Sequence, residues 1–104
     1  FCSVPPEMGP KSVIDRIEQL DPSLMIAIDG YTWGSKRIGR ADEVARIREA
    51  LPNMQVVLLP YQEANPEVPT GVIAYADFIA DAAPLDFEPV AFEHPLVILF
   101  SSGR

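Results

Sequence analysis

Apolar residues recur with the spacing of an amphipathic helix in two stretches of the chain, residues 10–20 and 40–51. The apolar positions are Val13, Ile14, Ile17 and Leu20 in the first stretch and Ala41, Val44, Ala45, Ile47, Ala50 and Leu51 in the second. Pro22 and Pro52 come just after these stretches, and the residue before a proline is disfavoured in the helical conformation. The pattern therefore predicts two helices that end near these prolines, and a short third helix is expected at residues 75–80.

Three runs dominated by apolar residues have the length of a β-strand: residues 24–28, 55–59 and 95–100. Such runs suit strands of a sheet that is covered on both faces. Strands and helices alternate along the chain, which is typical of parallel sheets with right-handed crossovers. The predicted fold is therefore a single α/β domain, a three-layer, mostly parallel sheet flanked by helices in the manner of a Rossmann or flavodoxin-like subdomain.

The remaining segments predict loops and edges. Gly34-Ser35 within residues 31–38 favours a hairpin or an ordered loop. Residues 60–73 are rich in proline and glycine and are expected to form a loop. Residues 87–92 alternate in polarity but contain Pro89, so an extended edge segment is expected there.

In open α/β sheets, ligands lie beyond the carboxyl ends of the strands. This rule predicts that the segments after the three runs, Asp29-Gly30, Pro60-Tyr61 and Ser101-Ser102-Gly103, share one edge. Small hydroxyl residues and a glycine after a buried strand are typical of the opening of a phosphate-binding loop, whose N–H groups face the anion. The same three residues also fit an ordinary surface loop, and a full Walker pattern is absent.

The charge is unevenly distributed and limits the class of partner. The net charge is −7, and residues 49–103 contain no Lys or Arg. Nucleic-acid binding is therefore not expected, since it needs a basic surface. The local basic cluster, Lys36, Arg37 and Arg40, fits either an anion site or a solvated turn. Apolar runs of about five residues are far shorter than the roughly 20 needed to cross a bilayer, so no membrane span is expected.

Other chemistry-bearing residues are interpreted as structural. His94 precedes a proline and is interpreted as a loop residue, and Asp29 is interpreted as part of an Asp-Gly turn. Tyr31 and Trp33 can stack on a purine, but packing within a hairpin is the favoured interpretation. The single cysteine, Cys2, lacks an internal disulfide partner, which fits a reducing cytoplasm. No catalytic residue and no metal ligand is predicted.

Several stretches, in order, resemble a segment of the acetoacetyl-CoA synthetases, a family of acyl-adenylate-forming ligases. The likeness covers nearly the whole chain except roughly residues 62–85. Its main blocks are residues 1–16, Asp21-Pro22, Ala27-Ile28-Asp29-Gly30-Tyr31, Gly34-Ser35-Lys36, Glu43-Val44-Ala45, Ala50-Leu51-Pro52, Val57-Leu58-Leu59-Pro60-Tyr61, His94-Pro95-Leu96 and Phe100-Ser101-Ser102-Gly103. Blocks that match in the same order are more specific than any one of them.

The resemblance implies a cytoplasmic enzyme that adenylates acetoacetate or a similar short-chain acid with ATP and Mg²⁺ and passes the acyl group to CoA. Ser101, Ser102 and Gly103 match the opening of the family's loop around the ATP phosphates, and Arg104 stands where the family has Thr. Lys36 matches a basic position that meets the phosphates of CoA, whereas Thr32 stands where many relatives have Arg.

Because the chain starts at Phe1 rather than Met and stops inside this loop, it is expected to be a fragment of the ligase's N-terminal region. Such a fragment is expected to be inactive alone and to self-associate through exposed apolar surface. The alternative is a self-contained, flavodoxin-like binding module whose acidic half recruits a basic partner.

Overall fold

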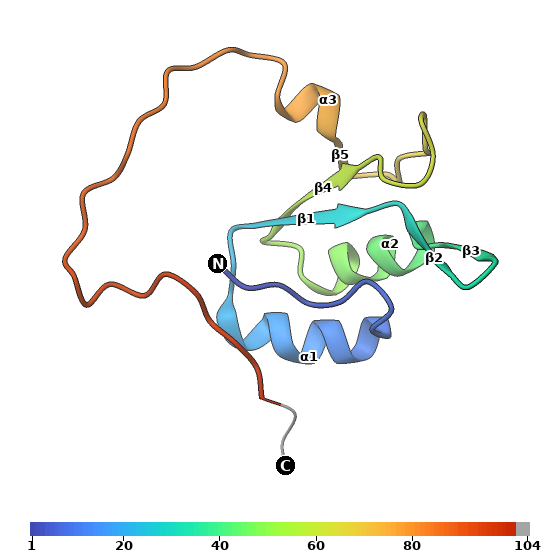
Figure 1. Cartoon of the computed structure of the whole chain (residues 1–104), viewed down its shortest axis with the longest axis horizontal. Coiled ribbons are helices and arrows are strands. Elements are labelled where there is room, and N and C mark those ends of the chain that lie inside the picture. The colour runs from blue at the N-terminus through green and yellow to red at the C-terminus, as the bar shows by residue number, and fades with distance from the viewer. Residues whose placement is uncertain (102–104) are drawn as a thin grey trace.

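The computed structural model describes residues 1–101 and shows an α/β arrangement (Figure 1). In chain order the elements are α1 (Pro10–Leu20), β1 (Leu24–Ile28), β2 (Gly30–Trp33), β3 (Lys36–Gly39), α2 (Ala41–Ala50), β4 (Gln55–Leu59), β5 (Ile73–Ala74) and α3 (Tyr75–Phe78). The two long helices, α1 and α2, and the strands β1 and β4 match the sequence predictions closely. The hairpin is confirmed as β2 and β3, and α3 is shorter than predicted.

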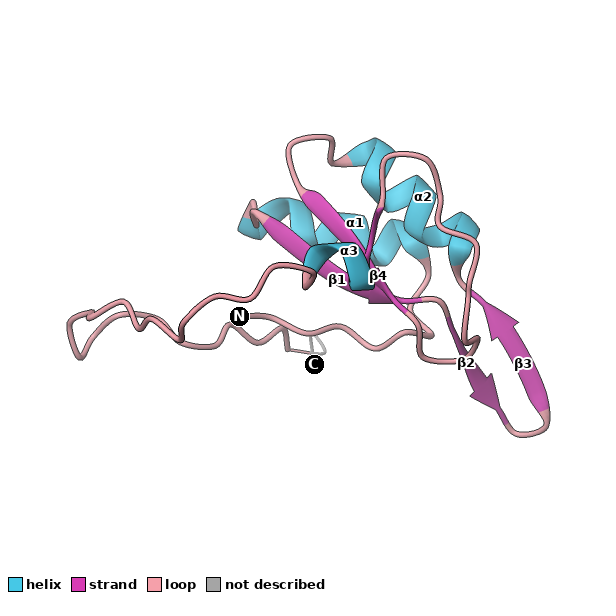
Figure 2. Ribbon diagram, turned by 90° about the horizontal axis from the view of Figure 1, so that it is seen from above, coloured by secondary structure: helices cyan, strands magenta, loops and turns pink. Residues whose placement is uncertain are grey.

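The main sheet is parallel, with strand order β1-β4-β5. Strands β1 and β4 pair along their whole length, from Leu24 opposite Gln55 to Ile28 opposite Leu59. The crossover between them contains α2 and the antiparallel β2–β3 hairpin, which projects from the carboxyl end of β1 (Figure 2). The hairpin therefore stands at the edge of the sheet where ligands of parallel α/β folds bind.

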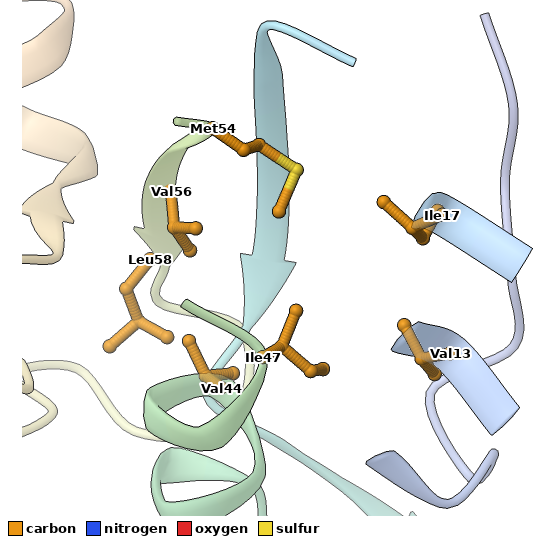
Figure 3. Packing of buried hydrophobic residues seen from close by; sticks show 7 residues of the cluster. All are labelled: Val13, Ile17, Val44, Ile47, Met54, Val56 and Leu58. Carbon is orange, nitrogen blue, oxygen red and sulfur yellow. The ribbon is translucent and has the colours of Figure 1, made fainter. Parts of the chain in front are cut away.

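The hydrophobic core lies where α1 and α2 cover one face of the sheet (Figure 3). Its buried members are Val13, Ile17, Val44, Ile47, Met54, Val56 and Leu58. In Figure 1, α3 lies on the opposite side of the strands from these two helices and packs against β4 and β5. Val57 is fully buried between two core residues of β4, which shows that this strand is covered on both faces, as its continuous apolar sequence predicts.

The third strand of the sheet differs from the prediction. β5 comes from the end of the expected 60–73 loop, with Ile73 opposite Val57 and Ala74 opposite Leu58. The predicted buried strand at residues 95–100 was wrong, because this segment has no strand structure and Leu96 and Leu99 are each 81% exposed. The expected extended edge at residues 87–92 is likewise not part of a sheet.

Residues 79–100 instead form a wide arc that leaves the sheet after α3 and returns beside the N-terminus (Figure 1). The returning end is tied to Phe1, whose amino group donates to the Leu96 carbonyl at 3.1 Å and whose carbonyl accepts from the Ile98 N–H at 2.9 Å. An apolar run becomes a buried strand only where a neighbouring strand and a covering layer complete it. Within residues 1–101 the 95–100 run has neither, so its side chains remain largely exposed.

Candidate functional site

A buried carboxylate organises the carboxyl end of the sheet. Asp29 follows β1 directly and is 7% exposed. Its Oδ1 accepts hydrogen bonds from the backbone N–H groups of Tyr61 at 2.7 Å and Gln62 at 2.9 Å, and its Oδ2 accepts one from Glu63 at 2.8 Å. These bonds fasten the end of β1 to the loop after β4, residues 60–63, which we call the β4 loop.

The protonation state of Asp29 follows from two opposing effects. Burial by itself raises the pKa of this carboxyl, because it disfavours the charged form. Hydrogen bonds from the backbone N–H groups of Gln62, Tyr61, Glu63 and Asp29 itself stabilise the carboxylate and lower the pKa below its ordinary value. The lowering prevails, so Asp29 is an anion at neutral pH.

The anion that the N–H groups of the β4 loop bind is the Asp29 carboxylate. Three successive N–H groups at the end of a parallel strand can form a binding site for a phosphate. Here they are already occupied by the Asp29 carboxylate, so they are not open to a ligand. The expected proximity of Asp29-Gly30 and Pro60-Tyr61 is confirmed, but the interpretation of Asp29 as a simple turn residue missed its long-range role. An acid directly after a buried strand is the signal that could have suggested it.

The hairpin carries the basic cluster, and the structure divides that cluster. Arg37 donates from Nη2 to the Gln62 carbonyl at 3.0 Å and forms an ion pair with Glu63, so it joins the hairpin to the β4 loop. Lys36 is exposed beside the turn, where Gly34 has a positive φ of 62°. Among residues 1–101 the ammonium of Lys36 pairs with no carboxylate. Lys36 is therefore the member of the cluster that is open to a ligand.

Arg40, just after the hairpin, is engaged by its own surroundings. Its guanidinium lies 5.1 Å from the centre of the Tyr31 ring and donates to the Tyr31 hydroxyl at 3.3 Å. It also pairs with Glu43 at 3.3 Å, with its side chain only 13% exposed. The packing interpretation of Tyr31 is thus supported, whereas Trp33 is 67% exposed on the same strand.

The predicted phosphate-loop residues lie elsewhere or outside the described part of the chain. Ser101 is exposed and follows Phe100, whose ring lies 5.9 Å from the Arg16 guanidinium on α1. In Figure 1 this end of the chain lies beside α1, away from the hairpin. Ser102, Gly103 and Arg104 lie outside the described residues. The expected common edge therefore joins the segments after β1 and β4, but not Ser101.

A mostly apolar cavity of about 710 Å³ lies between the N-terminal segment, α1, β1 and α2. Arg40 and Glu43 supply its charged lining, and Cys2 and Ile98 also border it. Lys36 is not part of its wall, so the cavity and the exposed face of the hairpin are separate features. Within residues 1–101, no group of three or more His, Cys, Asp or Glu side chains is placed to hold a metal ion. No helix in this part of the chain is long and apolar enough to span a bilayer.

Comparison with known proteins bears directly on the family. No protein-family model matches the chain. Over 99% of its length, however, it aligns with acetoacetyl-CoA synthetase of Mus musculus at 32% identity and with acetoacetyl-coenzyme A synthetase of Rhizobium meliloti (strain 1021) at 41%. A solved structure, acetoacetyl-CoA synthetase from Streptomyces lividans, superposes on 94% of the chain with a TM-score of 0.82 and 37% identity.

The chain is a relative of one segment of the acetoacetyl-CoA synthetases. It spans about one sixth of the length of these relatives: 17% of the mouse protein, 16% of the Rhizobium protein and 15% of the Streptomyces chain. The resemblance seen in the sequence blocks is therefore confirmed, and the α/β fold agrees with that of a solved acetoacetyl-CoA synthetase.

Proposed function

We propose that this chain forms part of an ATP-dependent acyl-CoA ligase that acts on acetoacetate or a similar short-chain acid. The proposal is carried by the match with acetoacetyl-CoA synthetases over 99% of the chain, together with the shared fold. In this reaction a substrate carboxylate oxygen attacks the α-phosphorus of ATP and pyrophosphate leaves. The CoA thiol then attacks the acyl carbonyl, and AMP leaves as the thioester forms.

In that reaction, residues of this chain would contact the phosphate groups of CoA and ATP. Lys36 would pair with a phosphate of CoA as a point charge on the exposed side of the hairpin. Its exposure and its lack of a carboxylate partner within residues 1–101 support this role. Thr32, on the paired strand, adds no positive charge, so we expect this contact to be weaker than one made by an Arg and a Lys together.

Ser101, Ser102 and Gly103 would begin the loop that holds the ATP phosphates. Their hydroxyl and backbone N–H groups are donors of the kind that stabilise phosphate charge during transfer. Mg²⁺ is the ion that accompanies ATP in such transfers. Since residues 1–101 contain no cluster placed to hold a metal, we assign no Mg²⁺ ligand to them. We expect the 104-residue chain alone to be inactive.

The role of Lys36 can be tested on this chain directly. We expect CoA to shift the NMR amide signals of β2 and β3, and pantetheine, which lacks the phosphates, to shift them far less. Lys36→Ala should weaken CoA binding by up to about fivefold, the effect of one exposed ion pair. Lys11→Ala is the matched control, because Lys11 is an exposed lysine on α1 that pairs with Asp15. Equal binding of CoA by both variants would exclude Lys36 as the contact.

The ligase activity needs a test on the enzyme that contains this segment. We expect its gene to continue in frame past residue 104 and to encode a later Pro-Lys pair, and its product to catalyse acetoacetate-dependent exchange of pyrophosphate into ATP. A stop codon directly after residue 104, with partner binding by the chain itself, would instead favour the self-contained binding module. The length of the match with acetoacetyl-CoA synthetases supports the ligase proposal over the binding module.

We also propose that the isolated chain self-associates. Phe92 is 99% exposed, Leu85 is 82% exposed and Leu96 is 81% exposed, all on the 79–100 arc. Exposed apolar side chains of this size favour burial against a second copy. Sedimentation velocity across the micromolar range should show dimers or larger species, and monomer alone would contradict the proposal. This chain has one cysteine and hence no internal disulfide, which fits a reducing cytoplasm, and we propose the cytoplasm as the location of the enzyme that contains it.

A further inference from the structure

We propose that Asp29 is a positioning residue: it fixes the β4 loop against the β2–β3 hairpin and thereby fixes the side of the hairpin on which Lys36 stands. The inference rests on the proposed function in one respect, namely that Lys36 is the CoA contact. The geometry around Asp29 is independent of that assignment.

Asp29 contacts the β4 loop and both ends of the hairpin at once. Its carboxylate accepts hydrogen bonds from the three backbone N–H groups of residues 61–63 at 2.7–2.9 Å. Its backbone carbonyl accepts the N–H of Arg40 at 2.8 Å. Asp29 directly precedes β2 and Arg40 directly follows β3, so the two ends of the hairpin close on this residue. Hydrogen bonds to a buried charged acceptor are among the stronger ones in proteins, and their loss leaves the donors unpaired.

The β4 loop then reaches the middle of the hairpin through Arg37. The guanidinium of Arg37 contacts both the Gln62 carbonyl and the Glu63 carboxylate, on residues whose N–H groups Asp29 holds. Neighbouring side chains on a strand point to opposite faces. Because Arg37 faces the loop, Lys36 stands on the other face, toward solvent. Asp29 therefore acts on Lys36 through the β4 loop and Arg37.

The base of the hairpin is closely packed against the β4 loop. A Cβ on Gly30 would lie 2.6 Å from the Ile38 carbonyl oxygen and 3.1 Å from Oε1 of Gln62. Loop and hairpin therefore approach each other directly at the residue next to Asp29. An anchor at this point controls the orientation of the whole two-stranded unit.

Asp29→Asn tests the proposal, because it keeps the size of the side chain but replaces one acceptor oxygen by an NH₂ donor that faces N–H groups. Asp86→Asn is the control, since Asp86 is exposed on the 79–100 arc. We expect amide hydrogen exchange at residues 61–63 to rise about tenfold or more in Asp29→Asn, in line with the loss of a charge-assisted bond. The residual dipolar couplings of β2 and β3, measured against those of β1 and β4, should shrink in this variant and stay unchanged in the control.

The binding readout separates positioning from general stability. In Asp29→Asn, the ratio of CoA affinity to pantetheine affinity should fall toward that of Lys36→Ala, although Lys36 is present. Unchanged couplings and an unchanged affinity ratio would overturn the positioning role. If CoA fails to bind the wild-type chain while the hairpin still loosens in Asp29→Asn, the Lys36 assignment fails and the structural anchor stands.

A second variant keeps the test decisive if Asp29→Asn does not fold. Arg37→Gln removes an exposed side chain and leaves the Asp29 contacts in place. It should loosen the hairpin and lower the CoA-to-pantetheine ratio without changing amide exchange at residues 61–63. A hairpin that keeps its couplings in Arg37→Gln would overturn the proposed route from Asp29 through the β4 loop.

Discussion

Gly30 and Ile38 approach so closely that a Cβ atom on Gly30 would lie 2.6 Å from the Ile38 carbonyl oxygen. Gly30 is buried and pairs with Gly39 at the base of the β2–β3 hairpin. A Cβ on Gly39 would meet nothing within 4 Å. The two paired glycines therefore differ: the backbone leaves no room for a side chain at Gly30, whereas Gly39 has room for one.

Gly30→Ala should destabilise the chain by about 1–3 kcal/mol, because the obstructing atom belongs to the backbone and cannot rotate away. Gly39→Ala should change the free energy of unfolding by no more than about 0.5 kcal/mol, as for an unobstructed surface position. Urea denaturation followed by circular dichroism measures both. Equal losses in the two variants would show that the hairpin base is not packed as described.

The lowered pKa of Asp29 predicts a specific dependence of stability on pH. A carboxyl whose folded-state pKa lies below its unfolded value of about 3.9 stabilises the fold fully above that value. The stabilisation is lost as the pH falls through the lower folded-state pKa. The difference in free energy of unfolding between wild type and Asp29→Asn should therefore be constant from neutral pH down to about pH 5 and shrink below about pH 4.

Urea midpoints at several pH values between 3 and 7 would measure this difference, and Asp86→Asn would serve as the control. Comparing the variants cancels most of the contribution of the other carboxyl groups. A difference between wild type and Asp29→Asn that grows as the pH falls would mean that the folded-state pKa of Asp29 is raised instead.

Two leucines in similar apolar runs should respond very differently to truncation. Leu58 lies in β4 and is 1% exposed, whereas Leu96 lies on the arc and is 81% exposed. Leu58→Ala should cost about 2–5 kcal/mol through lost burial and a residual cavity, as for other core leucines. Leu96→Ala should leave the free energy of unfolding within about 0.5 kcal/mol of wild type.

Denaturant unfolding and sedimentation of these two variants answer different questions. Leu96→Ala should weaken self-association, because it removes apolar area from the exposed arc. A large loss of stability in Leu96→Ala at concentrations where the chain is monomeric would mean that residues 95–100 are buried in solution.

The same two leucines show how far sequence patterns could predict this fold. The helical spacing around Val13 and Ile17 and the run from Val56 to Leu58 were sufficient, because the surfaces that bury them lie within the chain. The run at residues 95–100 has the same local composition, but burial depends on a covering layer that composition does not encode. β5 was missed for the opposite reason, since two residues paired to β4 carry no periodic signal.

The candidate site was predictable in part. Strand ends of a parallel sheet must share an edge, so the meeting of Asp29 with Tyr61 followed from the order of the elements. That the Asp29 carboxylate occupies the three N–H groups of the β4 loop did not follow, because hydrogen bonds between residues up to 34 positions apart depend on tertiary geometry. The sequence likewise did not show that Arg37 contacts the β4 loop whereas Lys36 does not, because this difference depends on where the fold places Glu63.

Gly71, before β5, offers a test of what holds the third strand in place. Its φ is +81°, and its carbonyl accepts a hydrogen bond from Nε of Arg48 on α2 at 3.2 Å. A Cβ there would lie 2.7–2.9 Å from atoms of the Arg48 guanidinium group. Gly71→Ala should therefore cost about 1–2 kcal/mol in backbone strain, because the left-handed conformation disfavours a side chain.

The steric and backbone contributions at Gly71 can be separated, because the obstructing group is the end of a flexible side chain. In an Arg48→Ala background the steric contact is gone but the positive φ remains, so Gly71→Ala should keep most of its cost. Gly9→Ala, at a position with no atom within 4 Å of a Cβ, controls for the loss of glycine itself. If Arg48→Ala made Gly71→Ala neutral, contact with the guanidinium would be the dominant effect, and β5 would depend on the position of α2 rather than on the turn.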